Sequence, residues 1–140
     1  MDDGTNDERL QAIAEAQPAF ALLLGLRVTR YARDRVEAEL EIREELANRN
    51  GVLHGGAIMA FADNLGGTAS HLNLPEGGRT TTIESKTNFF RAIPLGSTAR
   101  ATCLPLHRGR TTMVWQTTIT GEDGRVAAIV TQTQLVISRG

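Results

Sequence analysis

The chain has 140 residues, of which 41% are hydrophobic and 22% are charged, as in an ordinary folded domain with one hydrophobic core. Its 15 basic and 16 acidic residues nearly cancel and its aromatic residues are few, which excludes a general attraction to nucleic acid or to membranes. The single cysteine excludes an intrachain disulfide framework and favours the reducing cytoplasm. We expect neither a signal peptide nor a membrane span, because the N-terminus is acidic and no apolar run approaches ~18 residues.

The first third of the chain is expected to form a polar tail, two short helices and one strand. Residues 1–7 are polar and are predicted to be disordered. Between residues 8 and 24 apolar side chains recur at helical spacing; Pro18 divides this stretch into two pieces and Gly25 ends the second. Residues 26–43 alternate apolar with charged side chains, which predicts one long strand with one exposed face.

A long helix is predicted after a loop at residues 44–53. Residues 55 to about 72 are small and apolar, which indicates a helix buried on most sides. Gly66 and Gly67 stand in its middle, although each costs about 1 kcal/mol relative to alanine. Such glycines are tolerated where another part of the protein packs closely. The sequence leaves open whether that neighbour is the chain's own sheet or a second subunit.

Four runs rich in Thr, Val and Ile complete the chain, at residues 80–90, 97–106, 111–120 and 125–137. The last three runs are joined by Arg108-Gly109-Arg110 and by Glu122-Asp123-Gly124, both good hairpin turns. An antiparallel meander is therefore expected after the long helix. The layout is α+β, with about five strands around one helix, in a single domain over residues 1–140.

The stretch from Asn48 to Asp63 carries the strongest chemical signal. Gly55 and Gly56 open the long helix directly after His54. Peptide N–H groups at a helix start lack intrahelical partners and point along the positive end of the helix dipole. Because neither glycine has a side chain, a substrate oxygen can approach these donors closely. They suit an oxygen that gains negative charge during acyl transfer.

Asp63 lies among Phe61, Ala62 and Leu65 on the same helix. A carboxylate in apolar surroundings is costly unless it has a partner or a catalytic use. A structural ion pair, an exposed helix edge and a catalytic carboxylate all remain open from these residues. Gly55 precedes Asp63 by eight residues, about 12 Å along a helix, which is too far for both to contact one carbonyl group. If both act on one substrate, they must come from two chains at a dimer interface.

These residues resemble the hotdog thioesterase superfamily, and within it the phenylacetate-pathway (PaaI-like) acyl-CoA thioesterases, which are related to the 4-hydroxybenzoyl-CoA thioesterases. The likeness covers nearly the whole chain. It rests on the pattern Asn-x5-His-Gly-Gly-x6-Asp, supplied by Asn48, His54, Gly55, Gly56 and Asp63. The resemblance implies a long helix wrapped by a curved antiparallel sheet of five to six strands. It also implies a homodimer with a continuous sheet, and such dimers commonly pair into homotetramers.

The resemblance implies catalytic roles for five residues. Gly55 would donate its N–H to the thioester oxygen, and Asp63 of the neighbouring chain would act as general base or nucleophile. Asn48 would position the attacking water or the carboxylate, and His54 would shape the helix start. Thr82 matches a hydroxyl residue that assists the water, with the two preceding threonines as alternatives in register.

For the substrate, the resemblance implies acyl-coenzyme A, with Gly56 beside the thioester and Arg108 and Arg110 near the nucleotide end. Arginine suits phosphate because its charge is permanent and its fork binds two oxygens. Arg91 is a similar candidate, and a solvated turn is the alternative at Arg108. No cofactor beyond the substrate's own coenzyme A is expected, and no metal, because the His and Cys residues lack paired spacing. Candidates for a pocket that takes medium-chain or aryl acyl groups are Met59, Phe61, Phe89 and Phe90.

Two other functions remain open. A non-catalytic acyl-CoA-binding hotdog domain does not need a carboxylate beside a thioester, so Asp63 argues against it. A hotdog enoyl-CoA hydratase would have a histidine five residues after the aspartate, where this chain has Thr68. The chain contains neither a Gly-x-Ser-x-Gly elbow nor a Walker phosphate loop, which argues against a serine hydrolase and a P-loop NTPase.

Overall fold

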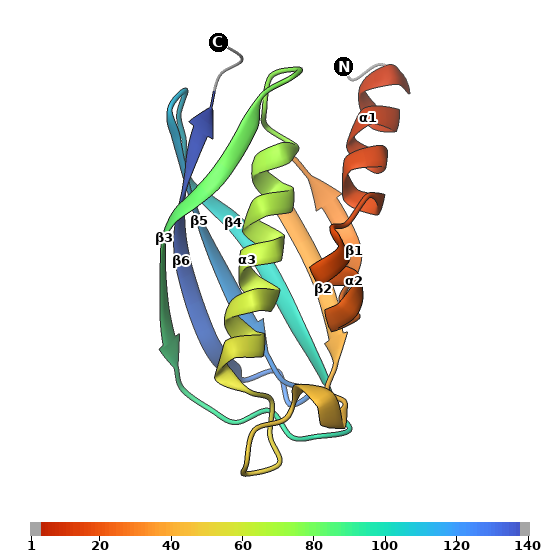
Figure 1. Ribbon diagram of the computed structural model, residues 1–140, viewed down its shortest axis with the longest axis vertical. Coiled ribbons are helices and arrows are strands. Elements are labelled where there is room, and N and C mark those ends of the chain that lie inside the picture. The colour runs from red at the N-terminus through yellow and green to blue at the C-terminus, as the bar shows by residue number, and fades with distance from the viewer. Residues whose placement is uncertain (1–3, 138–140) are drawn as a thin grey trace.

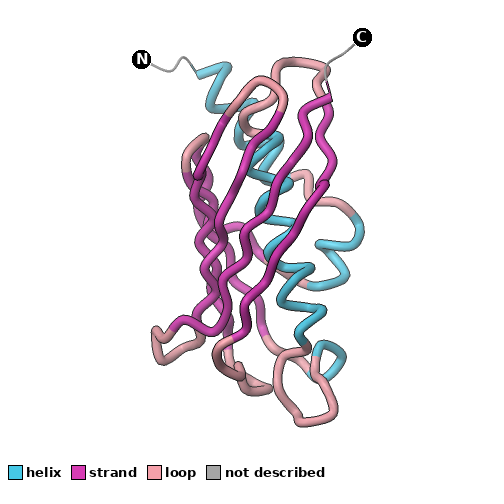
Figure 2. The backbone as a smooth tube through the Cα atoms, turned by 90° about the vertical axis from the view of Figure 1, so that its left-hand side faces the viewer, coloured by secondary structure: helices cyan, strands magenta, loops and turns pink. Residues whose placement is uncertain are grey.

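The computed structural model describes residues 4–137, in which a six-stranded antiparallel sheet packs against a long helix, α3 (Figure 1). Helices α1, α2 and α3 lie on the same side of the sheet (Figure 2). Among the described residues, no helix is both long enough and apolar enough to cross a membrane. The helices are α1 (Gly4–Glu15), α2 (Ala19–Leu24), the 3-10 turn η1 (Glu44–Leu46) and α3 (Gly55–His71). The strands are β1 (Arg27–Ala32), β2 (Arg35–Glu41), β3 (Arg79–Phe89), β4 (Thr98–Arg108), β5 (Thr112–Thr120) and β6 (Val126–Ile137).

The N-terminal segment forms the two predicted short helices. They are separated at Pro18, which lacks the N–H that a continuous helix needs. Helix α2 ends at Gly25, whose φ of 85° lies in the left-handed region that glycine adopts without steric cost. Helix α1 begins at Gly4, inside the stretch predicted to be a disordered tail; residues 1–3 lie outside the described residues.

Residues 26–43 form a hairpin of two strands, not the single long strand that was predicted. Ala32 of β1 lies opposite Arg35 of β2, so Arg33 and Asp34 form a two-residue turn. In β2 alternate residues are buried, as the sequence pattern indicates. Strand β1 is largely exposed. Alternation fixes which side chains face the core, but it does not mark the point at which the chain reverses direction.

The sheet order is β1-β2-β4-β5-β6-β3, which corrects the predicted meander. The hairpins β4–β5 and β5–β6 are as expected, but β4 pairs with β2, and β3 crosses to the far edge beside β6. Periodicity identifies strands but not their partners, so this crossing was not visible in the sequence. Its consequence is an edge strand, β3, that lies beside α3 (Figure 1).

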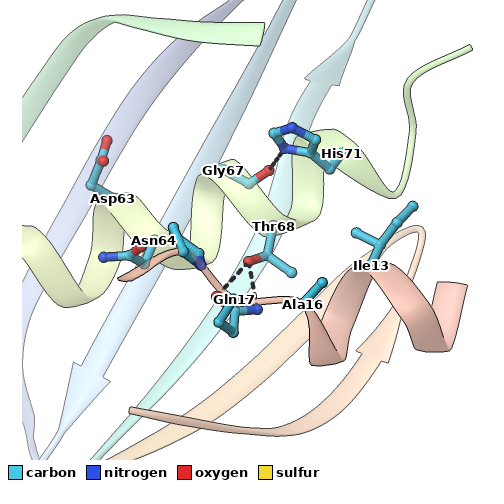
Figure 3. Close-up of a pocket in the computed structure, with 9 residues that line it drawn as sticks. Ile13, Ala16, Gln17, Asp63, Asn64, Gly67, Thr68 and His71 are labelled. Carbon is cyan, nitrogen blue, oxygen red and sulfur yellow. Dashed lines mark hydrogen bonds between the residues drawn. The ribbon is translucent and has the colours of Figure 1, made fainter. Parts of the chain in front are cut away.

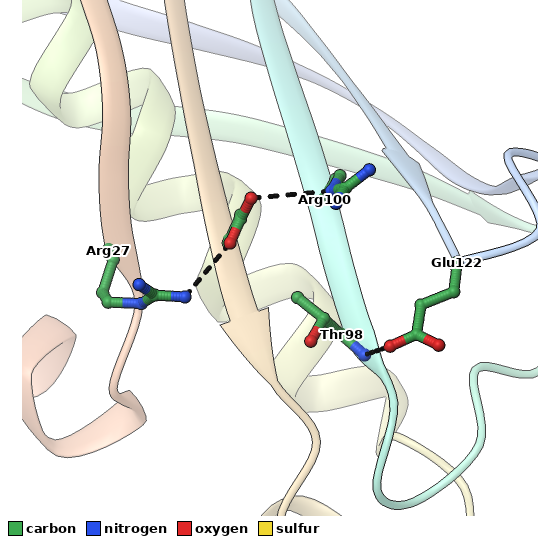
Figure 4. Close-up of polar contacts among 5 residues, drawn as sticks. Arg27, Thr98, Arg100 and Glu122 are labelled. Atoms are coloured by element: carbon green, nitrogen blue, oxygen red, sulfur yellow. Dashed lines mark hydrogen bonds and ion pairs between the residues drawn. The ribbon is translucent and has the colours of Figure 1, made fainter.

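The inner face of the sheet and α3 share one hydrophobic core. Phe61 and Trp115 are fully buried there, and the Trp115 indole Nε1–H donates to Ser70 Oγ at 2.8 Å. The outer face carries charged side chains, where Glu39 lies between Arg27 at 3.1 Å and Arg100 at 3.5 Å (Figure 4). The sheet therefore has one buried face, which α3 covers, and one solvent-exposed face.

Candidate active site

The start of α3 leaves one peptide donor open. His54 is the N-cap residue, and its Nδ1 accepts the Gly56 N–H at 2.8 Å. The Gly56 N–H, predicted to contact substrate, is therefore already used within the chain. The Gly55 N–H makes no hydrogen bond with any residue that the structure describes. Gly55 alone retains a donor that points out of the helix start.

The ring of Phe89, from the end of β3, lies against Gly55. A Cβ atom at Gly55 would stand 3.3 Å from Phe89 Cε1, which is tighter than an ordinary contact. Phe89 is itself 52% exposed in the chain. The open N–H thus stands beside an aromatic ring that is only half covered.

Asn48 shapes the loop that leads into α3. Its side-chain oxygen accepts the N–H groups of Asn50 at 2.9 Å and of Val52 at 3.3 Å. Gly51 closes the same loop with a φ of 75°. Within the described part of the chain Asn48 makes no hydrogen bond with Asp63. The role predicted for Asn48 at the carboxylate therefore finds no contact inside one chain.

Asp63 lies on an exposed face of α3, although its sequence neighbours are apolar. Phe61, Ala62 and Leu65 turn toward the core, whereas Asp63 points away from it. Its Oδ1 accepts from the Thr82 hydroxyl at 2.9 Å and from Gln132 Nε2 at 3.4 Å. Within residues 4–137 no cation forms an ion pair with it. The surroundings of this carboxylate are neutral hydrogen-bond donors on one side and open space on the other.

Thr82 is the threonine of its run that reaches Asp63. The ladder between β3 and β6 shifts register between Thr82 and Glu84, which is a bulge. Before the bulge Thr82 points to α3, and after it Phe89 does so, although the two residue numbers differ in parity. The sequence analysis did not identify Gln132, because a glutamine in a strand rich in Thr and Val is expected to be exposed on the surface.

A cavity of about 460 Å³ opens beside Asp63, between α3 and the segment formed by the end of α1 and residues 16–18 (Figure 3). Two polar pairs lie within its walls: Gln17 Nε2 with Thr68 Oγ1 at 3.2 Å, and His71 Nδ1 with the Gly67 carbonyl at 2.8 Å. The predicted acyl-pocket residues lie elsewhere, since Phe61 belongs to the core and the others are not part of these walls. The walls are formed by Ile13, Ala16, Gln17, Pro18, Asp63, Asn64, Gly67, Thr68 and His71.

The predicted arginines separate into two places. Arg108 and Arg110 line a pocket of about 790 Å³ at the C-terminal end of α3, together with Arg33, which the sequence analysis did not single out. Arg108 Nη1 also donates to the Arg33 carbonyl oxygen at 3.4 Å. Arg91 lies in a different pocket, beside Asp123 and near the β5–β6 turn. The structure therefore groups Arg108 with Arg110 but not with Arg91.

Two observations bear on other chemistries. Thr68, which stands where a hydratase would have histidine, is buried and bonded to Gln17. Across residues 4–137 no group of three His, Cys, Asp or Glu side chains is placed to hold a metal ion. The groups that this site offers are the Asp63 carboxylate, the Thr82 hydroxyl and the open backbone N–H of Gly55.

The family model of the thioesterase superfamily matches residues 50–128, which is more than half of the chain. The chain belongs to the thioesterase superfamily. A relative, the proofreading thioesterase EntH of Cronobacter turicensis, is 35% identical over 102 residues, 73% of this chain and 74% of EntH. The predicted activity class, thioester hydrolase, is thereby confirmed.

Solved structures of thioesterases share the fold. A variant of the thioesterase PA1618 from Pseudomonas aeruginosa superposes with a TM-score of 0.82 at 28% identity, over 93% of this chain and 92% of that one. The PaaI protein from the phenylacetic acid degradation operon of E. coli gives a TM-score of 0.84 at 20% identity, over 95% and 94% of the two chains, and so speaks for the fold alone. The predicted PaaI-like hotdog fold is confirmed.

Proposed function

We propose that this thioesterase hydrolyses acyl-coenzyme A, with Asp63 as general base or nucleophile and the Gly55 N–H polarising the thioester carbonyl. The observation that carries the proposal is the position of Asp63: an exposed carboxylate at the wall of a 460 Å³ cavity, in a thioesterase-superfamily chain. The acyl group occupies this cavity, whose size and largely apolar walls suit a medium-chain or aryl group.

The shared site follows from helix geometry. Gly55 and Asp63 lie on one straight helix, about 12 Å apart along its axis, whereas a reacting carbonyl needs both groups near 3 Å. Gly55 therefore works with Asp63 of the partner subunit in a homodimer, which has two such sites. The edge strand β3, which carries Thr82 and Phe89 beside α3, is the natural place for two protomers to meet.

The pocket lined by three arginines is the proposed binding site for the coenzyme A part of the substrate. Arg33, Arg108 and Arg110 surround a 790 Å³ pocket at the end of α3. One of its lining residues, Leu72, directly follows α3 and lies nine residues beyond Asp63. Nine residues correspond to about 14 Å along a helix, which is the distance from Asp63 to this end of the pocket. An extended pantetheine arm spans such a gap, so the phosphates reach the arginines while the thioester lies at Asp63.

The test is a panel of aliphatic and aromatic acyl-CoA thioesters, with release of free thiol followed for the wild type, Asp63→Asn and Asp123→Asn. We expect turnover of at least one thioester, and a fall in kcat of roughly 10²- to 10⁴-fold for Asp63→Asn. Asp123→Asn is the matched control, since Asp123 lies at the β5–β6 turn. Binding without hydrolysis would indicate an acyl-CoA-binding domain, and an unimpaired Asp63→Asn would overturn the assignment of the base.

A further inference from the structure

Two glutamines of β6 are buried directly behind Asp63. Gln132 and Gln134 are each only 1% exposed, and they are among the largest fully buried side chains of the protein. Burial of an amide is unfavourable unless the amide makes hydrogen bonds. Gln134 meets this demand by bonding to Thr80 and Thr82 of β3. The other glutamine reaches Asp63 itself.

The carboxylate sets the direction of this hydrogen-bonded chain. An ionised Asp63 only accepts, so the Thr82 hydroxyl must donate its hydrogen to Oδ1, at 2.9 Å. The Thr82 oxygen is then an acceptor, and Gln134 Nε2 donates to it at 2.6 Å. Gln134 Oε1 in turn accepts from the Thr80 hydroxyl at 2.9 Å. The four side chains form one directed path that ends on Asp63 Oδ1.

Gln132 is held against α3 at a cost to its own hydrogen bonding. Its Nε2 faces Asp63 Oδ1 at 3.4 Å, while its Oε1 is buried without a partner among the residues that the structure describes. The space it occupies exists because position 66 has no side chain: a Cβ at Gly66 would lie 2.2 Å from Gln132 Cδ. A buried acceptor left unpaired is unfavourable, and this arrangement keeps the amide pointed at the carboxylate.

Both donors converge on the same oxygen. Thr82 and Gln132 reach Oδ1, whereas Oδ2 receives no hydrogen bond from residues 4–137. We propose that Gln132 and Gln134 are positioning residues that fix Asp63 through Oδ1, directly and by way of Thr82, and so present Oδ2 alone to the thioester. The proposal rests on the catalytic role of Asp63 given above and adds which oxygen acts and what holds it.

The kinetic test compares Gln132→Met, which removes the amide at similar volume, with Gln132→Glu. We expect kcat to fall roughly 10- to 100-fold in Gln132→Met with KM nearly unchanged, because a displaced catalytic group slows the chemical step more than binding. Gln132→Glu donates a hydrogen bond only while protonated, so its kcat relative to wild type should fall as pH rises. Gln116→Met is the matched control, since Gln116 is half-buried on β5 and its side chain bonds to Thr131, away from Asp63.

An unchanged kcat in Gln132→Met overturns the proposal, as does a ratio of Gln132→Glu to wild-type kcat that does not change with pH. Should Gln132→Met fail to fold, Gln134→Met tests the second route to Asp63, through Thr82, with the same expected loss of kcat.

Crystal structures of the wild type and of the variant add a readout that needs no substrate. Asp63 should hold one orientation in the wild type and several in Gln132→Met or Gln134→Met. If no thioester of the panel is cleaved, the proposed function fails, while the orientation of Asp63 still decides the positioning proposal. An identical carboxylate position in wild type and variant contradicts it.

Discussion

His54 illustrates how a single side chain limits the chemistry of a helix start. Histidine is not among the preferred N-cap residues, yet its Nδ1 takes the Gly56 N–H as a serine or aspartate oxygen would. The cap accepts one of the backbone N–H groups that lack an intrahelical partner and leaves the Gly55 N–H without a hydrogen bond among the described residues. A helix start with every donor capped could not stabilise an oxyanion, and one with none capped would be less stable.

Cys103 is predicted to be unreactive in the folded protein. Burial raises the pKa of its thiol to about 11, so very little thiolate, the nucleophilic form, exists near pH 8. We expect negligible reaction of the native protein with a dithiobis-nitrobenzoate reagent, and one thiol per chain after unfolding in guanidinium. Absorbance of the released nitrothiolate measures both. Full labelling of the native protein would contradict the prediction and would add background to the thioesterase assay.

Arg110→Gln is predicted to weaken recognition of coenzyme A without altering the chemistry. If Arg110 binds a phosphate, KM for acyl-CoA should rise about 10-fold or more, because charge-assisted hydrogen bonds are worth roughly 1.5–3 kcal/mol. The matched substrate is the same acyl group on pantetheine, which lacks the nucleotide; its KM should not change. An equal effect on both substrates would mean that Arg110 acts through the structure of the hairpin.

At the scale of the element, the bulge in β3 decides which side chains meet α3. Side chains of a regular strand alternate between faces, so Thr82 and Phe89 should lie on opposite faces. The shift in register between Thr82 and Glu84 reverses the parity, so that both point toward the helix. One strand thereby brings a hydroxyl to Asp63 and an aromatic ring to Gly55. A bulge leaves no clear mark in a run of threonines, so the sequence could not assign this register.

The two mid-helix glycines of α3 are predicted to respond oppositely to alanine. Gly66→Ala forces Gln132 to move and should lower the free energy of unfolding by about 1–3 kcal/mol. Gly67 has open space where a Cβ would be, so Gly67→Ala should be neutral or stabilise the protein by up to ~1 kcal/mol.

In a Gln132→Ala background the clash at Gly66 disappears, and Gly66→Ala should then also be neutral or stabilising. Urea unfolding of the two single variants and the double variant measures this coupling. Additive effects would show that Gly66 and Gln132 do not depend on each other.

At the scale of the whole molecule, β3 forms an edge of the sheet and carries exposed apolar side chains. β3 is an edge strand whose Ile83 and Phe89 are 57% and 52% exposed, and Met59 of the adjacent helix is 40% exposed. An exposed edge strand with apolar side chains tends to pair with another strand. Pairing of β3 with β3 of a second copy would extend the sheet and bring two α3 helices together, as the proposed shared site requires.

A mixing experiment tests the shared site directly. Asp63→Asn removes the carboxylate, and Gly55→Pro removes the open N–H at the first helix position, whose backbone accommodates proline. His54 already has the extended backbone (φ −62°, ψ 136°) that a residue before proline adopts, and the half-exposed ring of Phe89 must shift to make room. Each variant alone should be nearly inactive. Unfolded together and refolded at equal amounts, they should regain about a quarter of wild-type activity, since half of the dimers are hybrids with one intact site of two. No recovery above either variant refolded alone would place the site within one chain.

The sequence by itself determined the features that depend on local pattern: the break at Pro18, the extent of α3, the hairpins of β4–β6 and the grouping of Gly55 with Asp63 on one helix. These follow from backbone sterics and from the spacing of apolar side chains, which act between near neighbours. Only the tertiary structure decided that β3 lies beside β6, that Thr82 and Gln132 bond to Asp63, and that the end of α1 and residues 16–18 line a cavity next to it. Such contacts join residues about 20 to 70 positions apart, and their geometry depends on strand register, on a bulge and on the space left at Gly66, none of which local periodicity specifies.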